Sequence, residues 1–441
     1  MSENREKNNS TEAYKGVRDF YPEDMFIQNY LFGVWKKTVE SFGYIEYNAS
    51  ILEPTELYKS KSGEEIVNEQ TYSFTDRGDR EVTLRPEMTP TVARMVAAKR
   101  RELSFPVRWY SIPNLFRYER PQRGRLREHW QLNADLFGVS SIDAEVEAIS
   151  MAQALLTNFS LDPKNFLIKI NYQGLLSNFL ASHFTLTQEK IHRTIKLLDR
   201  KNKMEKAAFN ESLENIIGLD NRNEFNRLLE HNLLESQVRE MPEYVYCMDL
   251  KARLSALGIN VEINLLQTRG FDYYTGIVFE VFDTDKNNNR SIFGGGRYDD
   301  LLSIFGVEPI PTVGFGIGDV VIRDVLETYG LLPTYIPTTD LYIASLNDTY
   351  HEAASELAST LRKEGLNVAV DYSGRKVSDQ VKKAVKEKIP FFICIGQDEF
   401  DSKTYKVKTL AEEEETPVTE AEIATFIAYR KTHKIKKDAT E

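Results

Sequence analysis

Between residues 108 and 138, and again between residues 261 and 318, strand-like segments follow one another with no helical pattern between them. The first region contains WYSIPNLFRYE and LREHWQLNADLFG, and the second contains VEINLLQTRGFDYYTGIVFEVF, SIFGGGRYDDLL and VGFGIG. Parallel neighbours need a crossover connection of a dozen or more residues, whereas antiparallel neighbours need only a turn. The pattern therefore favours an α+β fold with an antiparallel sheet flanked by helices over alternating βαβ units.

Helical and turn patterns lie before these strands. Apolar residues at helical spacing, such as Ile27, Leu31 and Val34, predict a first helix that begins near Pro22. A strand-like pattern is also present between residues 42 and 52. Residues 70–84 carry β-branched and aromatic residues around the turn Asp-Arg-Gly-Asp, which predicts a hairpin, and residues 85–98 are predicted to be helical.

Changes in composition divide the chain into parts. Residues 174–245 are poor in glycine and rich in Leu, Asn, Lys and Glu, with helical spacing of Ile191, Ile195 and Leu198, which predicts a helical insertion. The segment PTYIPTTD has the composition of a linker. The predicted parts are a flexible arm (1–14), a catalytic-sized body (15–173 and 246–332), the insertion (174–245), a linker (333–339) and a C-terminal domain (340–441).

The C-terminal domain has a different pattern from the body. Short apolar strands such as LYIASL and FFICIG alternate with helical segments. This alternation predicts a small α/β domain with a largely parallel sheet.

Charge and composition exclude several classes of protein. The 56 basic and 67 acidic residues give a net charge of −11, which argues against a surface that attracts nucleic acid everywhere. No apolar run reaches the roughly 20 residues of a membrane span, and the polar N-terminus lacks the apolar core of a signal peptide. The two cysteines are far apart and have no partner at metal-binding spacing. We therefore expect a cytoplasmic protein with no membrane span, disulfide or zinc site.

Five arginines are concentrated between residues 116 and 127 despite the acidic total. They are Arg117, Arg120, Arg123, Arg125 and Arg127. The guanidinium group is suited to phosphate because it carries five donors and a permanent charge. Arg117 is predicted to lie inside a strand, where alternation places it with Glu119 on one face and Phe116 with Tyr118 on the other. A solvated, salt-bridged face is the alternative interpretation.

Charged and polar residues also occur within apolar strand-like text, where an unpaired charge would cost several kcal/mol. They are Arg85, Glu87, Arg117, Glu119, Gln131, Asp135 and Arg269. Such a set suits a reaction in which a carboxylate attacks the α-phosphate of ATP, because arginine can screen two anions and stabilise the transition state. Nearby carboxylates could hold Mg²⁺ or a substrate ammonium group.

Glycines, tyrosines and one histidine are further candidates. Gly294–Gly296 and the alternating Gly314, Gly316 and Gly318 match neither a P-loop nor a dinucleotide motif, so they indicate close strand packing, a floor for a flat ligand, or both. Tyr273 and Tyr274 lie beside Arg269, and strand alternation would let only one of them face a pocket. His129, the histidine near the arginines, is expected to be structural.

These segments resemble motifs of class II aminoacyl-tRNA synthetases, and specifically of the histidyl-tRNA synthetase family. The similar segments span most of the chain: GVRDFYPEDM, TLRPEMTPTVAR, FRYERPQRGRLREHWQLNADLFG, RGFDYYTG and FGGGRYDDL. The resemblance implies an enzyme that uses ATP and Mg²⁺ to form histidyl-adenylate from L-histidine and then charges tRNA(His), releasing pyrophosphate and AMP. It also implies a homodimer, and residues 340–441 resemble an anticodon-binding domain.

Carried over by position, the resemblance also implies roles for individual residues. Arg117 and Arg269 would be catalytic cations near the α-phosphate. ATP would be bound by Arg117, Glu119 and Arg125. Histidine would be bound by Glu87, Thr89, Gln131, Asp135, Arg269, Tyr273, Tyr274 and Tyr298, with Asp135 and Tyr274 reading the imidazole. The resemblance identifies no protein ligand for Mg²⁺.

One motif departs from the family pattern. The third motif usually ends in Gly-Leu-Glu-Arg, whereas Gly318 is here followed by Asp319, Val320 and Val321. Arg323 lies two places further along, an offset of about 200° on a helix, so we do not expect it to replace the missing arginine.

Two other functions stay open at this point. One is a non-catalytic regulator of synthetase-like fold, such as the regulatory subunit of ATP phosphoribosyltransferase, although such proteins usually lack an anticodon module. The other is an RNA-binding sensor built on a degenerate synthetase.

Overall fold

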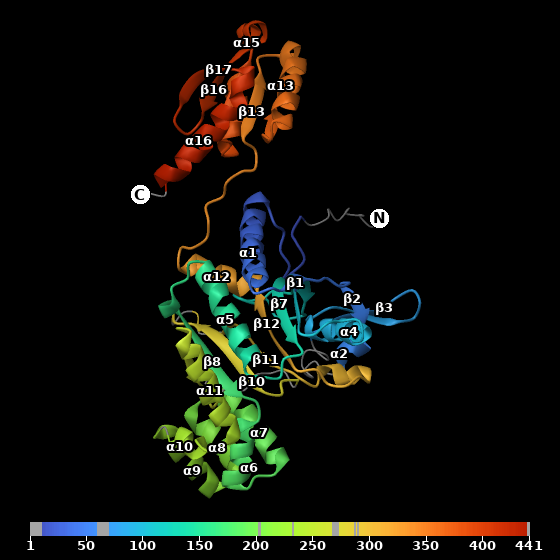
Figure 1. Ribbon diagram of the computed structural model, residues 1–441, viewed down its shortest axis with the longest axis vertical. Coiled ribbons are helices and arrows are strands. Elements are labelled where there is room, and N and C mark those ends of the chain that lie inside the picture. The colour runs from blue at the N-terminus through green and yellow to red at the C-terminus, as the bar shows by residue number, and fades with distance from the viewer. Residues whose placement is uncertain are drawn as a thin grey trace, which may run out of the picture. The chain divides into compact units, whose positions relative to one another are not determined.

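The structure is a computed structural model that describes residues 11–59, 70–201, 204–231, 233–266, 273–285, 288 and 291–438 (Figure 1). The chain forms two compact units, Met1–Pro333 and Thr334–Glu441. Each unit has its own hydrophobic core and is described separately.

A nine-stranded sheet, counted over the described residues, runs through the first unit in the order β1-β5-β7-β12-β11-β10-β8-β9, with β6 paired to β7. Its strands are β1 (Ile45–Glu46), β5 (Val107–Ser111), β6 (Asn114–Phe116), β7 (Glu128–Phe137), β8 (Phe166–Tyr172), β9 (Val261–Ile263), β10 (Ile277–Asp283), β11 (Ser291–Arg297) and β12 (Thr312–Gly318). The interior pairs are antiparallel, as predicted. The edge pairs β1–β5 and β8–β9 are parallel, which the sequence pattern did not reveal.

One face of this sheet is covered by long helices that bury the main core (Figure 1). They are α1 (Pro22–Ser41), α5 (Asp143–Asn158), α11 (Pro242–Ala256) and α12 (Asp319–Thr328). Trp35 of α1 and Leu155 of α5 are fully buried in this core together with Leu132 and Leu136 of β7. Because side chains alternate along a strand, Gln131, Asn133 and Asp135 of β7 face the other side of the sheet. That side carries the candidate site.

Smaller elements cover the second face. They are β2 (Leu52–Pro54), α2 (Glu56–Lys59), β3 (Tyr72–Thr75), β4 (Glu81–Leu84), α4 (Thr89–Lys99) and the 3₁₀ helix η3 (Leu301–Phe305). The hairpin β3–β4 confirms the predicted turn. The predicted helix over 85–98 begins later, at Thr89, because Arg85 is held in a loop by the carbonyl oxygens of Asn114 and Ala49. The strand-like text at 42–52 yields two short strands.

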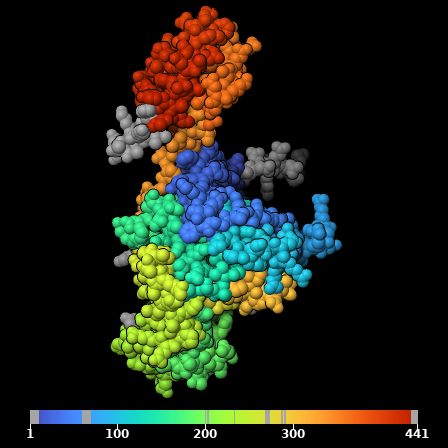
Figure 2. Space-filling view, viewed as in Figure 1, coloured from blue at the N-terminus to red at the C-terminus, as the bar shows by residue number. Residues whose placement is uncertain are grey.

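The helices α6 (Leu175–Phe184), α7 (Gln188–Arg200), α8 (Lys206–Ile217), α9 (Leu219–Glu230) and α10 (Leu234–Val238) form a lobe at one end of the first unit (Figure 2). They bury a core of their own, which includes Phe179, Leu213 and Phe225. The following helix, α11, buries Cys247 and Leu250 in the main core, although the predicted insertion extended into its first turn.

The second unit contains a five-stranded sheet, counted over the described residues, in the order β14-β13-β15-β16-β17. Its elements are β13 (Leu341–Ser345), α13 (His351–Lys363), β14 (Val368–Val370), α14 (Val377–Lys386), β15 (Phe391–Ile395), α15 (Gln397–Ser402), β16 (Thr404–Thr409), β17 (Glu414–Thr419) and α16 (Ile423–Asp438). Only β14, β13 and β15 are parallel, whereas β16 and β17 add an antiparallel edge. The expectation of a largely parallel sheet was therefore wrong for β16 and β17. Their short connections allow an antiparallel hairpin, which needs no crossover helix.

A buried ion pair connects β11 to α5. Arg297 donates from Nε and Nη2 to the two carboxylate oxygens of Glu145, both at 2.7 Å, and the two residues are 6% and 1% exposed. Replacing Glu145 by Gln would leave a buried cation with too little counter-charge. We expect Glu145→Gln to lower the free energy of unfolding of the first unit by about 3–5 kcal/mol, measured by chemical denaturation.

Glu230→Gln is the matched control, because Glu230 pairs with Lys206 at 2.9 Å on the exposed surface of the insertion. Such an exposed pair is screened by solvent and contributes little to stability. Equal losses in both variants would contradict a special contribution from the buried pair.

Candidate active site

The candidate site lies on the face of the sheet where β7 runs beside the glycine-containing strand β12. Asp135 is paired with Gly314, and Asn133 is paired with Gly316. A Cβ atom at Gly314 would overlap the carboxylate of Asp135 and the hydroxyl of Tyr298, and a Cβ atom at Gly316 would lie 2.6 Å from Gln131 Nε2. Glycine is needed in β12 because polar side chains of β7 and Tyr298 occupy the space above it.

Asp135 is a deeply buried carboxylate on this face, with 4% of its surface exposed. The hydroxyl of Tyr298 donates a hydrogen bond to Oδ1, whereas Oδ2 has no partner within the part of the chain that the structure describes. Burial raises the pKa of Asp135 to about 7, and the bond from Tyr298 opposes this rise. The carboxylate therefore keeps one acceptor oxygen for a ligand.

Three tyrosine rings surround this carboxylate. The ring centroids of Tyr273 and Tyr274 lie 5.0 Å apart, and those of Tyr273 and Tyr298 lie 5.6 Å apart. Tyr273 and Tyr274 come before β10, which begins at Ile277, so strand alternation does not separate them. The expectation that only one could face a pocket was wrong, because both rings also contact Tyr298. Burial raises the pKa of Tyr273 and of Tyr298, so both phenols are donors.

Glu87 and Thr89 approach the same rings from the beginning of α4. Tyr273 donates to Glu87 Oε2 at 3.4 Å, and Glu87 is 3% exposed. Thr89 is the first residue of α4, and its hydroxyl lies beside Tyr273. Burial raises the pKa of the Tyr273 phenol, and the Thr89 hydroxyl acts against this rise. The structure thus brings Glu87, Thr89, Asp135 and the tyrosines into one cluster.

Arg117 lies between this cluster and the residues near His129. Its Nε donates to the carbonyl oxygen of Pro86 at 2.9 Å, next to Glu87. Its positive charge acts both on Tyr273 and on His129. The predicted strand position was wrong by one residue: β6 ends at Phe116, although the backbone N–H of Arg117 still donates across to Arg127 O.

The five arginines of residues 116–127 do not form one patch. Arg125 pairs with Glu119 at 3.2 Å, and Arg123 lies 3.9 Å from Asp324 of α12. Arg127 is largely buried, with its guanidinium 4.0 Å from the centre of the Tyr118 ring. The two residues predicted to hold ATP on this loop, Glu119 and Arg125, are therefore partners of one another.

His129 lies on β7 two residues before Gln131, on the same face. Burial and the positive charges of Arg117 and Arg18 lower its pKa to about 3. The imidazole is therefore neutral at physiological pH, which excludes a role as a charged group.

The residues that depart from the third family motif anchor α12. Asp319 is fully buried and accepts hydrogen bonds from Arg18 Nη2 (2.6 Å), Gln28 Nε2 (3.0 Å) and the backbone N–H of Trp130 (3.0 Å). Val321 is the side chain nearest to Gly124 of the arginine-containing loop. Arg323 donates to Asp24 of α1 at 2.8 Å.

Some site residues were predicted but are not placed, and others were not predicted. Arg269, proposed as a catalytic and histidine-binding cation, lies outside the described residues. Asn133 was missed, although the alternation of Gln131, Asn133 and Asp135 along one strand was a usable signal. Tyr47 and Ser111 join this face only through the parallel register of β1 and β5, for which the sequence gives no signal.

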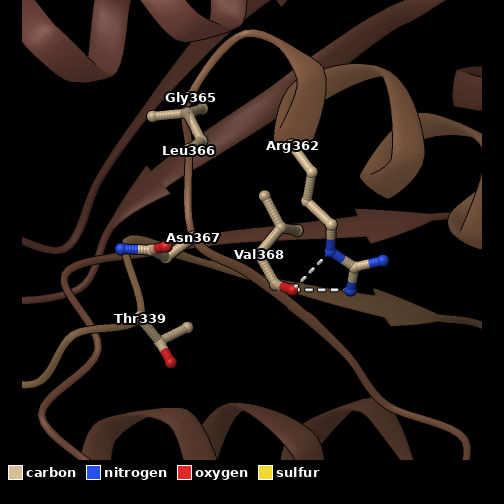
Figure 3. A pocket seen from close by; sticks show the side chains of 6 residues that line it. All are labelled: Thr339, Arg362, Gly365, Leu366, Asn367 and Val368. Carbon is tan, nitrogen blue, oxygen red and sulfur yellow. Dashed lines mark hydrogen bonds between the residues drawn. The ribbon is translucent and has the colours of Figure 1, made fainter.

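A hollow in the second unit offers no comparable chemistry. It lies around the turn between α13 and β14, where Arg362 donates from Nε and Nη2 to the carbonyl oxygen of Val368 (Figure 3). Two of the nitrogens of Arg362 are thus engaged by the turn itself. Within the described ranges, no group of three or more His, Cys, Asp or Glu side chains could hold a metal ion. The helices of those ranges include none with the length and apolar character for crossing a membrane.

Comparisons with known proteins agree with this arrangement. A family model described as histidyl-tRNA synthetase matches residues 16–318, and one described as an anticodon binding domain matches residues 340–430. A histidine–tRNA ligase of Leptospira biflexa is 41% identical over 92% of this chain and 95% of its own length. A histidine–tRNA ligase of Halobacterium salinarum is 37% identical over 93% of this chain and 96% of its own length.

Solved structures share the fold. The crystal structure of histidyl-tRNA synthetase from Nostoc sp. PCC 7120 has a TM-score of 0.77 at 22% identity, and covers 96% of this chain and 100% of its own. A Bacillus halodurans structure, described as an ATP phosphoribosyltransferase regulatory subunit/histidyl-tRNA synthetase, has a TM-score of 0.72 at 23% identity and covers 89% of this chain and 100% of its own. These likenesses establish a class II synthetase fold with a C-terminal α/β domain.

The burial of Asp135 makes stability depend on pH. Its pKa rises from 3.8 to about 7 on folding, so the stability that its protonated form supplies is complete below pH 4 and is lost as the pH rises through about 7. We expect Asp135→Asn to gain stability relative to the parent between pH 4 and pH 8, by at most about 4 kcal/mol for a shift of about three units. Thermal unfolding at both pH values measures this difference.

Asp162→Asn is the control, because the exposed Asp162 has a pKa lowered by its bond to Lys164. Its stability relative to the parent should not rise with pH. A rise of equal size in both variants would contradict the assignment to Asp135.

Proposed function

Since the chain belongs to the histidyl-tRNA synthetase family, we propose that it activates L-histidine with ATP and transfers the histidyl group to tRNA(His). In the first step a carboxylate oxygen of histidine forms a bond to the α-phosphorus of ATP, and the bond from that phosphorus to the pyrophosphate oxygen breaks. In the second step a hydroxyl of the tRNA attacks the acyl carbon and AMP leaves. The observation that carries the proposal is the cluster of Asp135, Tyr298 and Glu87 beside Arg117.

Arg117 is proposed to stabilise the first transition state. Two anions must meet there, and a guanidinium group lowers their repulsion and stabilises charge on the phosphate oxygens. The bond from Arg117 Nε to Pro86 O supports this role, because it orients the group beside Glu87. Within the residues that the structure describes, its terminal nitrogens make no other hydrogen bond, so they can donate to phosphate. Arg269, which the family resemblance makes a second cation, stays a prediction.

The tyrosine-lined cluster is proposed to bind histidine. Asp135 would accept a hydrogen bond from one imidazole nitrogen, and Tyr274 would read the other, with Tyr273 and Tyr298 lining the pocket. Glu87, Thr89 and Gln131 would hold the ammonium group and the backbone end. An apolar substrate of similar size would cover the buried carboxylate of Asp135 without supplying the hydrogen bond that the imidazole gives, and sites of this kind reject such substrates strongly.

Glu119 and Arg125 are proposed to bind ATP. They are joined by an ion pair whose arginine is 54% exposed, so the pair can part when Glu119 meets the adenine and Arg125 meets the outer phosphates. Mg²⁺ is proposed to enter with ATP, held chiefly by the phosphates and water, as is usual for this ion.

The C-terminal unit is proposed to bind the anticodon of tRNA(His), as its match to an anticodon binding domain suggests. That match and the names of the curated relatives favour a ligase over a regulatory subunit or an RNA sensor. We further propose a cytoplasmic homodimer. Support for the dimer comes from β1, an edge strand whose Ile45 is 67% exposed.

ATP–pyrophosphate exchange tests the first step and its specificity. Run with each of the twenty amino acids in turn, exchange should occur with L-histidine alone, because only its imidazole offers one nitrogen to Asp135 and the other to Tyr274. Exchange with none of the amino acids would contradict an enzymatic function, and exchange with another amino acid would contradict the assigned specificity.

Arg117→Gln tests the role of the central cation. We expect a loss in the exchange rate of about 10²–10³-fold, the usual effect of removing one donor that acts in a transition state. Arg80→Gln is the matched control, since Arg80 is an exposed arginine that pairs with Asp76 in the β3–β4 turn. Exchange that falls to the same extent in both variants, or in neither, would refute the role of Arg117.

A further inference from the structure

Two buried hydroxyl groups, those of Tyr47 and Ser111, lie on the same face of the sheet as Asp135. The backbone N–H of Tyr47 donates to Tyr110 O at 2.8 Å, which extends the parallel β1–β5 ladder by one residue. Tyr47 and Ser111 are therefore neighbours across that ladder, and Ser111 is paired on its other side with Asn133. Neither residue lies in a segment that resembles a family motif.

Three polar atoms at this place have no hydrogen-bond partner among the described residues: Tyr47 Oη, Ser111 Oγ and Asp135 Oδ2. The three residues are 9%, 1% and 4% exposed. An unpaired buried polar atom costs about 1–3 kcal/mol, so such atoms are nearly always paired with protein or with ordered water.

The three groups also influence one another. Burial raises the pKa of Tyr47 well above its usual value, and the charge of Asp135 adds to this rise. The Ser111 hydroxyl lies close enough to Tyr47 Oη to oppose the rise as a hydrogen-bond donor, although no bond of full geometry joins the two hydroxyls. The Tyr47 phenol therefore keeps its proton and remains a donor. Tyr273 and Tyr298, in contrast, already use their protons for Glu87 and Asp135.

We propose that Tyr47 and Ser111 are positioning residues of the histidine pocket and that together they hold one buried water molecule, which donates a hydrogen bond to Asp135 Oδ2. The inference rests on the proposed function. A buried water needs two to four polar partners, and two hydroxyls and one carboxylate oxygen supply them. With Tyr298 on one oxygen and the water on the other, the carboxylate is fixed in orientation, and its charged form is favoured for accepting the imidazole N–H.

Other titratable and charged groups lie around Asp135 and the two hydroxyls. Tyr298 bonds to Asp135, and Tyr273 and Tyr274 contact Tyr298. The charges of Glu87 and Arg117 act on Tyr273, and the charge of Arg85 acts on Tyr47. Tyr44 packs in the core of the opposite face and is affected only by the charge of Asp135. Burial raises the pKa of Tyr44, Tyr273 and Tyr298, so these phenols keep their protons over the range tested below. All of these groups are unchanged in the test variants.

The test is the pH dependence of kcat/KM for histidine in ATP–pyrophosphate exchange, measured for Tyr47→Phe and Ser111→Ala and expressed as a ratio to the parent. The imidazole of the substrate titrates over the same range, but its effect cancels in the ratio. Loss of a hydrogen bond to the ionised carboxylate should raise the pKa of Asp135 by about one unit. The ratio should then be close to one at about pH 9 and fall to about one tenth at about pH 6.

The double variant sharpens the test. Because both hydroxyls hold the same water, Tyr47→Phe with Ser111→Ala should shift the pH profile no further than the more affected single variant. The KM for ATP should stay unchanged. A ratio that is lowered equally at every pH would overturn the proposal and leave a packing role, and additive shifts would overturn the shared water.

Tyr110→Phe is the matched control. Tyr110 precedes Ser111 on β5 but faces the opposite side of the sheet, where its hydroxyl donates to Glu40 Oε1 at 2.7 Å. Its ratio should be independent of pH. If the parent itself gives no histidine-dependent exchange, the proposed function fails together with this inference; a flat ratio in an active parent refutes the positioning role alone.

Discussion

The close approach of polar side chains to the glycines of β12 is the constraint on which the rest of the candidate site depends. Asp135 and Gln131 extend over Gly314 and Gly316 of β12, where even a methyl group would collide with them. The carboxylate is consequently covered by Tyr298 and its neighbouring rings, and it is buried before any ligand arrives. Such burial costs folding free energy at neutral pH, and what it provides is an acceptor whose position and surroundings are set in advance.

Positive charge is supplied locally in a chain that is acidic overall. The net charge of −11 limits nonspecific attraction of nucleic acid, whereas the reaction itself requires cations where two anions meet. Arg117, just beyond β6, supplies such a cation. The carbonyl of Pro86 orients it, and its charge acts on both Tyr273 and His129. The arginines of the following loop are instead divided among Glu119, Asp324 and the ring of Tyr118. Crowding of arginines in sequence is therefore a poor measure of positive charge in space.

Elements with regular periodicity could be predicted, and features that depend on strand register or on a turn could not. The antiparallel core, the insertion and the β3–β4 hairpin follow from alternation, helical spacing and turn residues. Gln131 and Asp135 were predicted to be site residues, and they do lie on one face of β7. Tyr47 was missed because its place depends on a parallel edge pair formed by residues far apart in sequence. Tyr273 and Tyr274 were misjudged because β10 begins after them.

The departure from the third motif is explained by what Asp319 holds together. At the first residue of α12, a fully buried carboxylate is stabilised by the helix N-terminus and by three donors from Arg18, Gln28 and Trp130. It thereby joins the N-terminal segment, α1 and β7 at one point. The charge of Arg18, held at this carboxylate, helps to keep His129 neutral. In this chain the first turn of α12 thus holds Arg18, Gln28 and the backbone of Trp130 in place beside β7. Val321, in the same turn, packs against the arginine-containing loop.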